Sequence, residues 1–126
     1  MTDRYRLHHA PDNASLIVRL ALEELRLDYD SQLVDRSQNA QRSAAHLALN
    51  PAGQIPVLET PQGPLFETGA ILLWLCDQHG SPAHKLGPTP QTPQRGAFLK
   101  WLFFLSNTLH NDLRQMFYPE RSVGPD

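Results

Sequence analysis

The spacing of hydrophobic residues changes once near the start of the chain, and this change limits the folds that the chain can adopt. Residues 5–9 combine an aromatic residue with a leucine, which is typical of a strand, and residues 11–13 then favour a turn. From Ala14 to about Leu27 the apolar residues recur at helical spacing, at Leu16, Ile17, Leu20, Leu22 and Leu25. Asp12 or Asn13 is expected to cap this helix. A strand, a turn and an amphipathic helix in this order predict an α/β fold.

The alternation of strands and helices continues to about residue 79. The elements predicted after the first helix are a strand at 29–34, a weaker helix rich in Ala and Gln at 37–49, a loop that becomes a strand at 53–59, a turn at 61–64, a return strand at 65–67, and a strongly apolar helix that Thr68 caps and that ends near His79. The order is β-α-β-α-β-β-α, in which the last two strands form an antiparallel hairpin.

A stretch rich in proline and glycine divides the chain after this unit. Residues 80–93 have the composition of a stiff connector, and residues 96–117 predict a long helix with many apolar side chains. We therefore predict a domain at 1–79, a linker at 80–93 and a helical segment at 94–126. The length of 126 residues excludes two full domains. The apolar face of the long helix needs a partner surface, which favours self-association.

Composition excludes several classes of function. The formal net charge of −2 provides no cationic field, so we expect no nucleic-acid partner. No apolar stretch approaches the length of a membrane span, so we expect no membrane partner and a cytoplasmic location. Cys76 is the only cysteine, which excludes an internal disulfide, and the six histidines lack the spacing of metal ligands. We expect no metal.

Two segments carry a resemblance to a known family. Residues 50–58 read Asn-Pro-Ala-Gly-Gln-Ile-Pro-Val-Leu, and residues 65–75 read Leu-Phe-Glu-Thr-Gly-Ala-Ile-Leu-Leu-Trp-Leu. Together they resemble the N-terminal thioredoxin-like domain of cytosolic glutathione transferases over residues 4–79. The resemblance implies a thioredoxin-like domain followed by a truncated all-α segment. It also implies glutathione as co-substrate, a small electrophile as second substrate, and a homodimer.

The resemblance assigns the glutathione site residue by residue. Pro56 resembles the family's cis-proline, which leaves the main chain of Ile55 open to pair with the cysteinyl backbone of glutathione as an added strand. Glu67 matches the acidic residue that meets the γ-glutamyl ammonium, and the Thr68 hydroxyl would meet the carboxylate. Gln54 matches a position that helps to bind the tripeptide. The alternative interpretation is a turn proline at Pro56 and a helix cap at Glu67 and Thr68.

The residue that activates the thiol is left open by the sequence. His8 occupies the family's tyrosine position, and Ala14 occupies the position of its cysteine. The candidate donors are therefore the Ser15 hydroxyl and the Asn13 amide, while His8 or His9 can donate if protonated. Both Ser15 and Asn13 are also ordinary residues at a helix start.

The predicted function is transfer of the glutathione thiolate to an electrophile. Family members continue through a helical domain of which only the opening helix is present here, so the chain is either truncated or lacks the usual pocket for the electrophile. The alternative function is a non-catalytic interaction or regulatory module of the same family.

Overall fold

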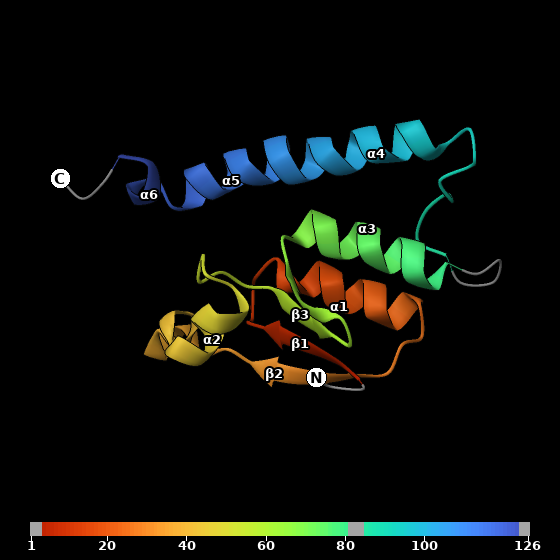
Figure 1. Ribbon diagram of the computed structural model, residues 1–126. Coiled ribbons are helices and arrows are strands. Elements are labelled where there is room, and N and C mark those ends of the chain that lie inside the picture. The colour runs from red at the N-terminus through yellow and green to blue at the C-terminus, as the bar shows by residue number, and fades with distance from the viewer. Residues whose placement is uncertain (1–3, 81–84, 124–126) are drawn as a thin grey trace. The chain divides into compact units, whose positions relative to one another are not determined.

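The computed structural model describes residues 4–80 and 85–123, and the chain divides into two compact units, Met1–Gly87 and Pro88–Asp126. Figure 1 shows strands and helices alternating in the first unit and only helices in the second. No helix among the described residues is long and apolar enough to cross a membrane.

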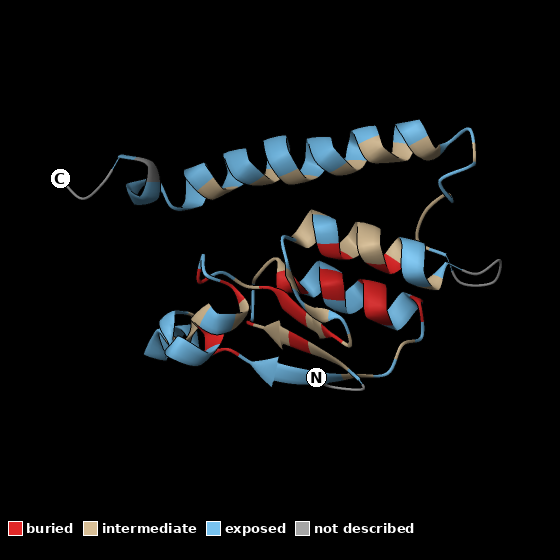
Figure 2. Cartoon of the chain, viewed as in Figure 1, coloured by how far each residue is buried: buried red, intermediate tan, exposed pale blue. Residues whose placement is uncertain are grey.

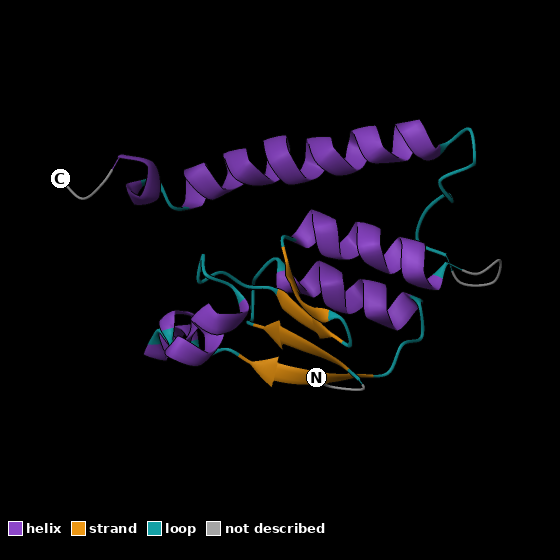
Figure 3. Ribbon diagram, viewed as in Figure 1, coloured by secondary structure: helices purple, strands orange, loops and turns teal. Residues whose placement is uncertain are grey.

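A mixed four-stranded sheet forms the centre of the first unit. The strands are β1 (Tyr5–His9), β2 (Tyr29–Leu33), β3 (Val57–Thr60) and β4 (Gly63–Phe66), in the order β2-β1-β3-β4. β1 and β2 are parallel, whereas β3 is antiparallel to both β1 and β4. The helices α1 (Ser15–Glu24) and α3 (Thr68–His79) lie side by side and cover one face (Figures 1 and 3). This is the predicted order of strands and helices.

The predicted helix over residues 37–49 was wrong in extent. The segment contains two 3-10 turns, η1 (Arg36–Gln38) and η2 (Ala40–Arg42), and only α2 (Ala44–Leu49) is an α-helix. Asn39 between the turns adopts a left-handed conformation with φ of 56°, which interrupts helical hydrogen bonding. Ser43 then caps α2, because its side chain accepts a hydrogen bond from the N–H of His46.

The hairpin and the helix caps also differ from the predictions. The return strand begins at Gly63 rather than at residue 65 and ends at Phe66. The N-cap of α3 is Glu67, without a side-chain cap bond, and Thr68 is the first helical residue. The N-cap of α1 is Ala14, although the Asn13 side chain accepts the N–H of Ser15 at 2.9 Å.

The core lies between the sheet and the two helices that cover it. Figure 2 shows its buried residues on the strands and on α1 and α3. Its fully buried apolar side chains are Leu7, Val18, Leu22, Leu58, Ile71 and Leu75. Each such side chain stabilises the fold by about 1.5–3 kcal/mol through burial. Leu16, Ile17 and Leu20 of α1 are 59%, 47% and 54% exposed, so only part of the predicted apolar face is core.

The second unit consists of helices. α4 (Arg95–Phe103) continues into the π-helical segment η3 (Phe104–Leu109) and then into α5 (His110–Phe117), and α6 (Glu120–Val123) follows. The predicted helix at 96–117 therefore exists with almost those bounds, but its middle third is wider than an α-helix. Among its described residues none is buried, as Figure 2 shows. Residues 81–84 of the predicted linker and residues 124–126 lie outside the described residues.

Candidate glutathione site

Strand pairing brings the predicted binding residues to the edge of the sheet at which β3 begins and β4 ends, across the strand ends. Val57 at the start of β3 pairs with Phe66 at the end of β4. Ile55 and Pro56 come just before Val57, and Glu67 and Thr68 come just after Phe66. Because the strands are antiparallel, these two pairs of residues continue the hairpin at the same edge.

The loop before α1 leaves the sheet at this edge as well. Val57 also pairs with His8 near the carboxyl end of β1, so the chain from Ala10 to Asn13 leaves β1 beside the start of β3. The structure therefore gathers the predicted glutathione-binding residues and the predicted thiol donors at one end of one sheet.

The main chain of Ile55 is open at this edge. The bond between Ile55 and Pro56 is cis, the geometry that the resemblance implied for Pro56. Among the described residues, no hydrogen bond involves the backbone N–H or C=O of Ile55. Ile55 is half-buried and Pro56 is buried. An extended ligand can therefore add to the sheet here through main-chain hydrogen bonds.

The start of α3 provides the second part of the edge. The carbonyl of the N-cap residue Glu67 accepts the first hydrogen bond of α3, from the N–H of Ile71 at 3.0 Å. The N–H groups of the first turn have no partner within the helix and attract a carboxylate. Glu67 is exposed and has φ of 73° and ψ of 109°, a conformation that L residues rarely adopt. The sequence contained no signal for this backbone conformation.

Ser15 and Asn13, the two candidate thiol donors, differ in how far their side chains are buried and hydrogen-bonded. Ser15 is 1% exposed, and its hydroxyl both donates to the Ala10 carbonyl and accepts the Ala10 N–H, each at 3.2 Å. Asn13 is half-buried and uses its Oδ1 for the Ser15 N–H. No described residue accepts a hydrogen bond from the Asn13 Nδ2, so this amide group can donate to a ligand.

The histidine at the family's tyrosine position points away from this loop. Leu7 lies in the core with α1, so its neighbour His8 faces the opposite side of the sheet. There the His8 Nε2 lies 2.7 Å from Glu59 Oε1, and Arg6 Nη1 lies 3.9 Å from the same oxygen. His8 is therefore hydrogen-bonded to Glu59 on the face of the sheet that lies toward α2.

Two further side chains hydrogen-bond to the main chain at this edge, and neither was predicted from the sequence. His46 Nε2 and Asn50 Nδ2 lie 2.9 Å and 3.1 Å from the carbonyl oxygen of Gln54, and both residues are buried. Asn50 also accepts the Ala52 N–H through Oδ1 at 3.0 Å. Asn50 is the first residue of the motif at 50–58, and this position could have indicated its role. No sequence feature indicated a role for His46. The side chain of Gln54 itself is exposed.

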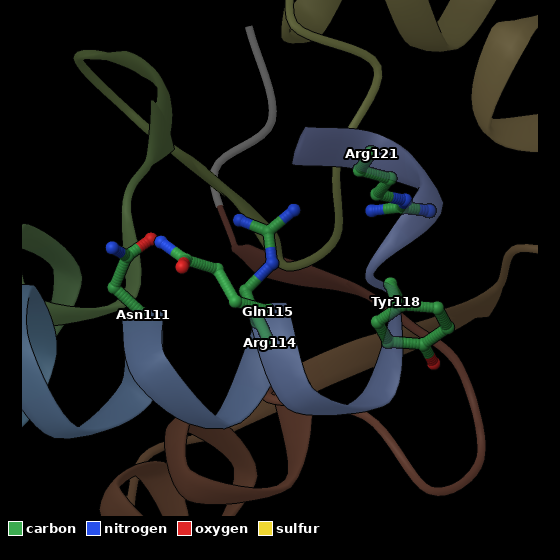
Figure 4. A pocket seen from close by; sticks show the side chains of 5 residues that line it. All are labelled: Asn111, Arg114, Gln115, Tyr118 and Arg121. Atoms are coloured by element: carbon green, nitrogen blue, oxygen red, sulfur yellow. The ribbon is translucent and has the colours of Figure 1, made fainter. Parts of the chain in front are cut away.

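The second unit has a polar pocket of its own. Its lining residues are Asn111, Arg114, Gln115 and Tyr118 of α5 and the turn after it, with Arg121 of α6 (Figure 4). The Arg121 guanidinium lies 4.8 Å from the centre of the Tyr118 ring. In the part of the chain that the structure describes, no group of three or more His, Cys, Asp or Glu residues is placed to hold a metal ion.

Comparison with known proteins identifies the family to which the chain belongs. The family defined as the glutathione S-transferase N-terminal domain matches residues 4–77, which is more than half of the chain. The chain belongs to the glutathione S-transferase family. It is 36% identical over 87 residues to glutathione S-transferase 1 of Schizosaccharomyces pombe, a match that covers 67% of this chain and 38% of that protein.

Other relatives of this family member are also longer. It is 34% identical over 105 residues to the disulfide-bond oxidoreductase YfcG of Escherichia coli, which covers 78% of this chain and 46% of that protein. The crystal structure of a glutathione transferase homologue from Sulfitobacter with bound glutathione matches with a TM-score of 0.78 and 29% identity, over 95% of this chain and 57% of that chain. This match confirms the thioredoxin-like fold with a following helical segment. The chain spans less than half of the length of the two curated relatives.

Proposed function

We propose that this glutathione S-transferase family member binds glutathione at the sheet edge formed by Ile55, Pro56, Glu67 and Thr68. The observation that carries the proposal is the open main chain of Ile55 next to a cis-proline, at the edge where α3 begins. The cysteinyl backbone of glutathione would add to the sheet at Ile55. The bound glutathione in the Sulfitobacter homologue supports this assignment.

The γ-glutamyl end of glutathione would lie at the start of α3. Its carboxylate would accept hydrogen bonds from the Thr68 hydroxyl and from free N–H groups of the first turn, where the helix dipole favours negative charge. Its ammonium would lie beside the exposed carboxylate of Glu67. The exposed side chain of Gln54 would contact the tripeptide at the adjacent position.

We propose further that the bound thiolate adds to a small electrophile and that Asn13 stabilises the thiolate. Lowering a thiol pKa from about 8.5 to about 6.5 requires ~2.7 kcal/mol, and a helix N-terminus supplies only ~0.3–1 kcal/mol. A hydrogen bond to a charged group contributes ~1.5–3 kcal/mol, so one further donor suffices. The Nδ2 group of Asn13 is available as this donor, because only the Oδ1 of Asn13 is hydrogen-bonded. The Ser15 hydroxyl is already hydrogen-bonded to the main chain of Ala10.

Calorimetric titration of the chain with glutathione tests the binding proposal. We expect saturable binding of one glutathione per chain, competed by glutathione analogues with an intact γ-glutamyl group. Absence of binding by a folded chain would refute it.

Thiol activation is tested by comparing Asn13→Ala with Ser15→Ala. Ultraviolet titration of the bound thiol and conjugation kinetics are measured for both variants and for the wild type. We expect Asn13→Ala to raise the pKa of the bound thiol, to slow conjugation, and to weaken glutathione binding at pH values at which the wild type holds the thiolate. Ser15→Ala is expected to lower the free energy of unfolding, because it leaves the buried Ala10 N–H without its partner, at a cost of about 1–3 kcal/mol. The reverse pattern would identify Ser15 as the donor.

The second candidate function is a non-catalytic interaction or regulatory module of the same family. The observation that favours it is the absence of a thiol or a free hydroxyl at the start of α1, since position 14 is Ala and the Ser15 hydroxyl is engaged. Glutathione binding with slow turnover that neither substitution changes would support this alternative over the enzyme.

A further inference from the structure

We infer that His46 is a positioning residue for the proposed glutathione site, because its ring holds the peptide unit that presents the Ile55 N–H to the ligand. The inference rests on the proposed function. His46 lies in α2, is 4% exposed, and places its Nε2 2.9 Å from the Gln54 carbonyl oxygen. A carbonyl oxygen only accepts hydrogen bonds, so the Nε2 of His46 carries the proton in this contact.

Because the peptide unit is planar, the hydrogen bond from His46 to the Gln54 carbonyl also fixes the direction of the Ile55 N–H. The Gln54 carbonyl and the Ile55 N–H belong to one planar trans peptide unit and point in opposite directions. His46 and Asn50 both donate to the carbonyl, at 2.9 Å and 3.1 Å, and so direct it toward α2. The Ile55 N–H is thereby directed away from α2, toward the open edge of the sheet.

The His46 ring is itself held from two sides. Its backbone is fixed at the start of α2 by the hydrogen bond from its N–H to Ser43 Oγ at 3.2 Å. Its ring meets the ring of His8 edge-on, with centroids 6.0 Å apart and an interplanar angle of 71°. His8 is in turn held by Glu59 at 2.7 Å. These contacts limit rotation of the ring, so the donor stays directed at Gln54.

The inference predicts different results for two substitutions at this position. His46→Phe fills the space of the ring and keeps an aromatic contact with His8, but it removes the donor. His46→Gln can place an amide N–H near the position of the imidazole Nε2. A residue that only fills space would be replaced better by Phe, whereas a donor would be replaced better by Gln.

Glutathione affinity measured by calorimetry tests this difference. We expect His46→Phe to weaken binding roughly threefold to tenfold, the effect of one neutral hydrogen bond, and His46→Gln to recover most of that loss. The matched control is His110→Phe in the second unit, which is expected to bind as the wild type does. Equal affinity of wild type and folded His46→Phe would overturn the inference, as would a folded His46→Gln variant that binds as weakly as His46→Phe.

A measurement on the wild type tests the same contact without a substitution. The ring nitrogen shifts of His46 in ¹⁵N NMR are expected to show a protonated Nε2, and the Ile55 amide shift is expected to change on glutathione binding. A His46 ring protonated only at Nδ1 would overturn the inference. If the wild type binds no glutathione, the proposed function fails and the inference fails with it; if the wild type binds and only the His46 predictions fail, the proposed function stands.

Discussion

Thr68 is the residue at which the proposed γ-glutamyl contact is most directly tested. It is the first residue of α3, it is half-buried, and its hydroxyl has no partner among the described residues. Thr68→Ala would remove a hydrogen bond to a carboxylate and is expected to weaken glutathione binding by ~1.5–3 kcal/mol, more than tenfold. Calorimetric titration measures this change.

The matched control for this substitution is Thr89→Ala, which alters an exposed threonine of the second unit. Its affinity for glutathione is expected to equal that of the wild type. A folded Thr68→Ala protein with unchanged affinity would show that the γ-glutamyl group does not bind at the start of α3.

His79 makes stability depend on pH. Burial lowers the pKa of His79 below the ordinary histidine value of about 6.5, and its Nε2 lies 2.6 Å from the hydroxyl of Tyr5. The unfolded chain therefore binds the proton more tightly than the folded chain does. The contribution of neutral His79 to the free energy of unfolding is therefore fully present above about pH 6.5. It is lost as the pH falls through the pKa of folded His79.

Urea denaturation at pH 7.5 and pH 5.5 measures this dependence. We expect the wild type to lose more stability between the two pH values than His79→Gln does, while His110→Gln follows the wild type. If His79→Gln loses as much stability as the wild type, another group is responsible for the pH dependence.

The loop between α2 and β3 is the element that orients the site, and Gly53 is its most constrained position. Gly53 has φ of 63°, and a Cβ there would lie 3.0 Å from two side-chain atoms of Arg42 and 3.1 Å from the Gln41 carbonyl oxygen. Gly53→Ala is expected to destabilise the protein by about 1–2 kcal/mol, because an L residue rarely adopts this conformation. Thermal unfolding followed by circular dichroism measures the loss.

Gly96 in α4 is the matched control for the loop glycine. A Cβ at Gly96 would meet no atom within 4 Å, and the residue is helical. Gly96→Ala is therefore expected to raise stability by roughly 0.5–1 kcal/mol, the opposite sign to Gly53→Ala. Equal stability of the Gly53→Ala variant and the wild type would contradict the importance of the loop conformation.

On the scale of the whole molecule, we predict that the 126-residue chain self-associates. The second unit exposes large apolar side chains along most of its length, at Trp101, Phe103, Phe104, Leu105, Leu109, Leu113, Met116 and Phe117. Trp101, Leu105, Leu109 and Leu113 are spaced four residues apart and favour a continuous apolar stripe. Contiguous apolar surface of this kind is typical of protein interfaces.

Sedimentation velocity over a range of concentrations tests self-association. We expect Leu105→Gln combined with Leu109→Gln to shift the chain toward monomer. The control, Leu16→Gln combined with Leu20→Gln, replaces two exposed leucines of α1 and is expected to have a smaller effect, because the apolar surface there is shorter. A monodisperse monomer that binds no hydrophobic dye would contradict the prediction.

Local patterns in the sequence determined the order of the elements and the family. Apolar periodicity located α1, because burial of one face depends on spacing along the chain. The high apolar content of two further segments located α3 and the long helix of the second unit. The motif at 50–58 identified the cis-proline, and the motif at 65–75 located the start of α3. These features depend mainly on residues close together in sequence.

Only the tertiary structure decided which side chains are available at the site. Ser15 and Asn13 were equivalent candidates in the sequence, but packing of α1 against the sheet buries Ser15 and pairs its hydroxyl with Ala10. His46 carried no sequence signal, and its role follows from its contacts with Gln54 and with His8 of a distant strand. The physical reason is that a polar side chain must satisfy its hydrogen bonds with whatever the fold brings near it, and those partners are set by packing rather than by local sequence.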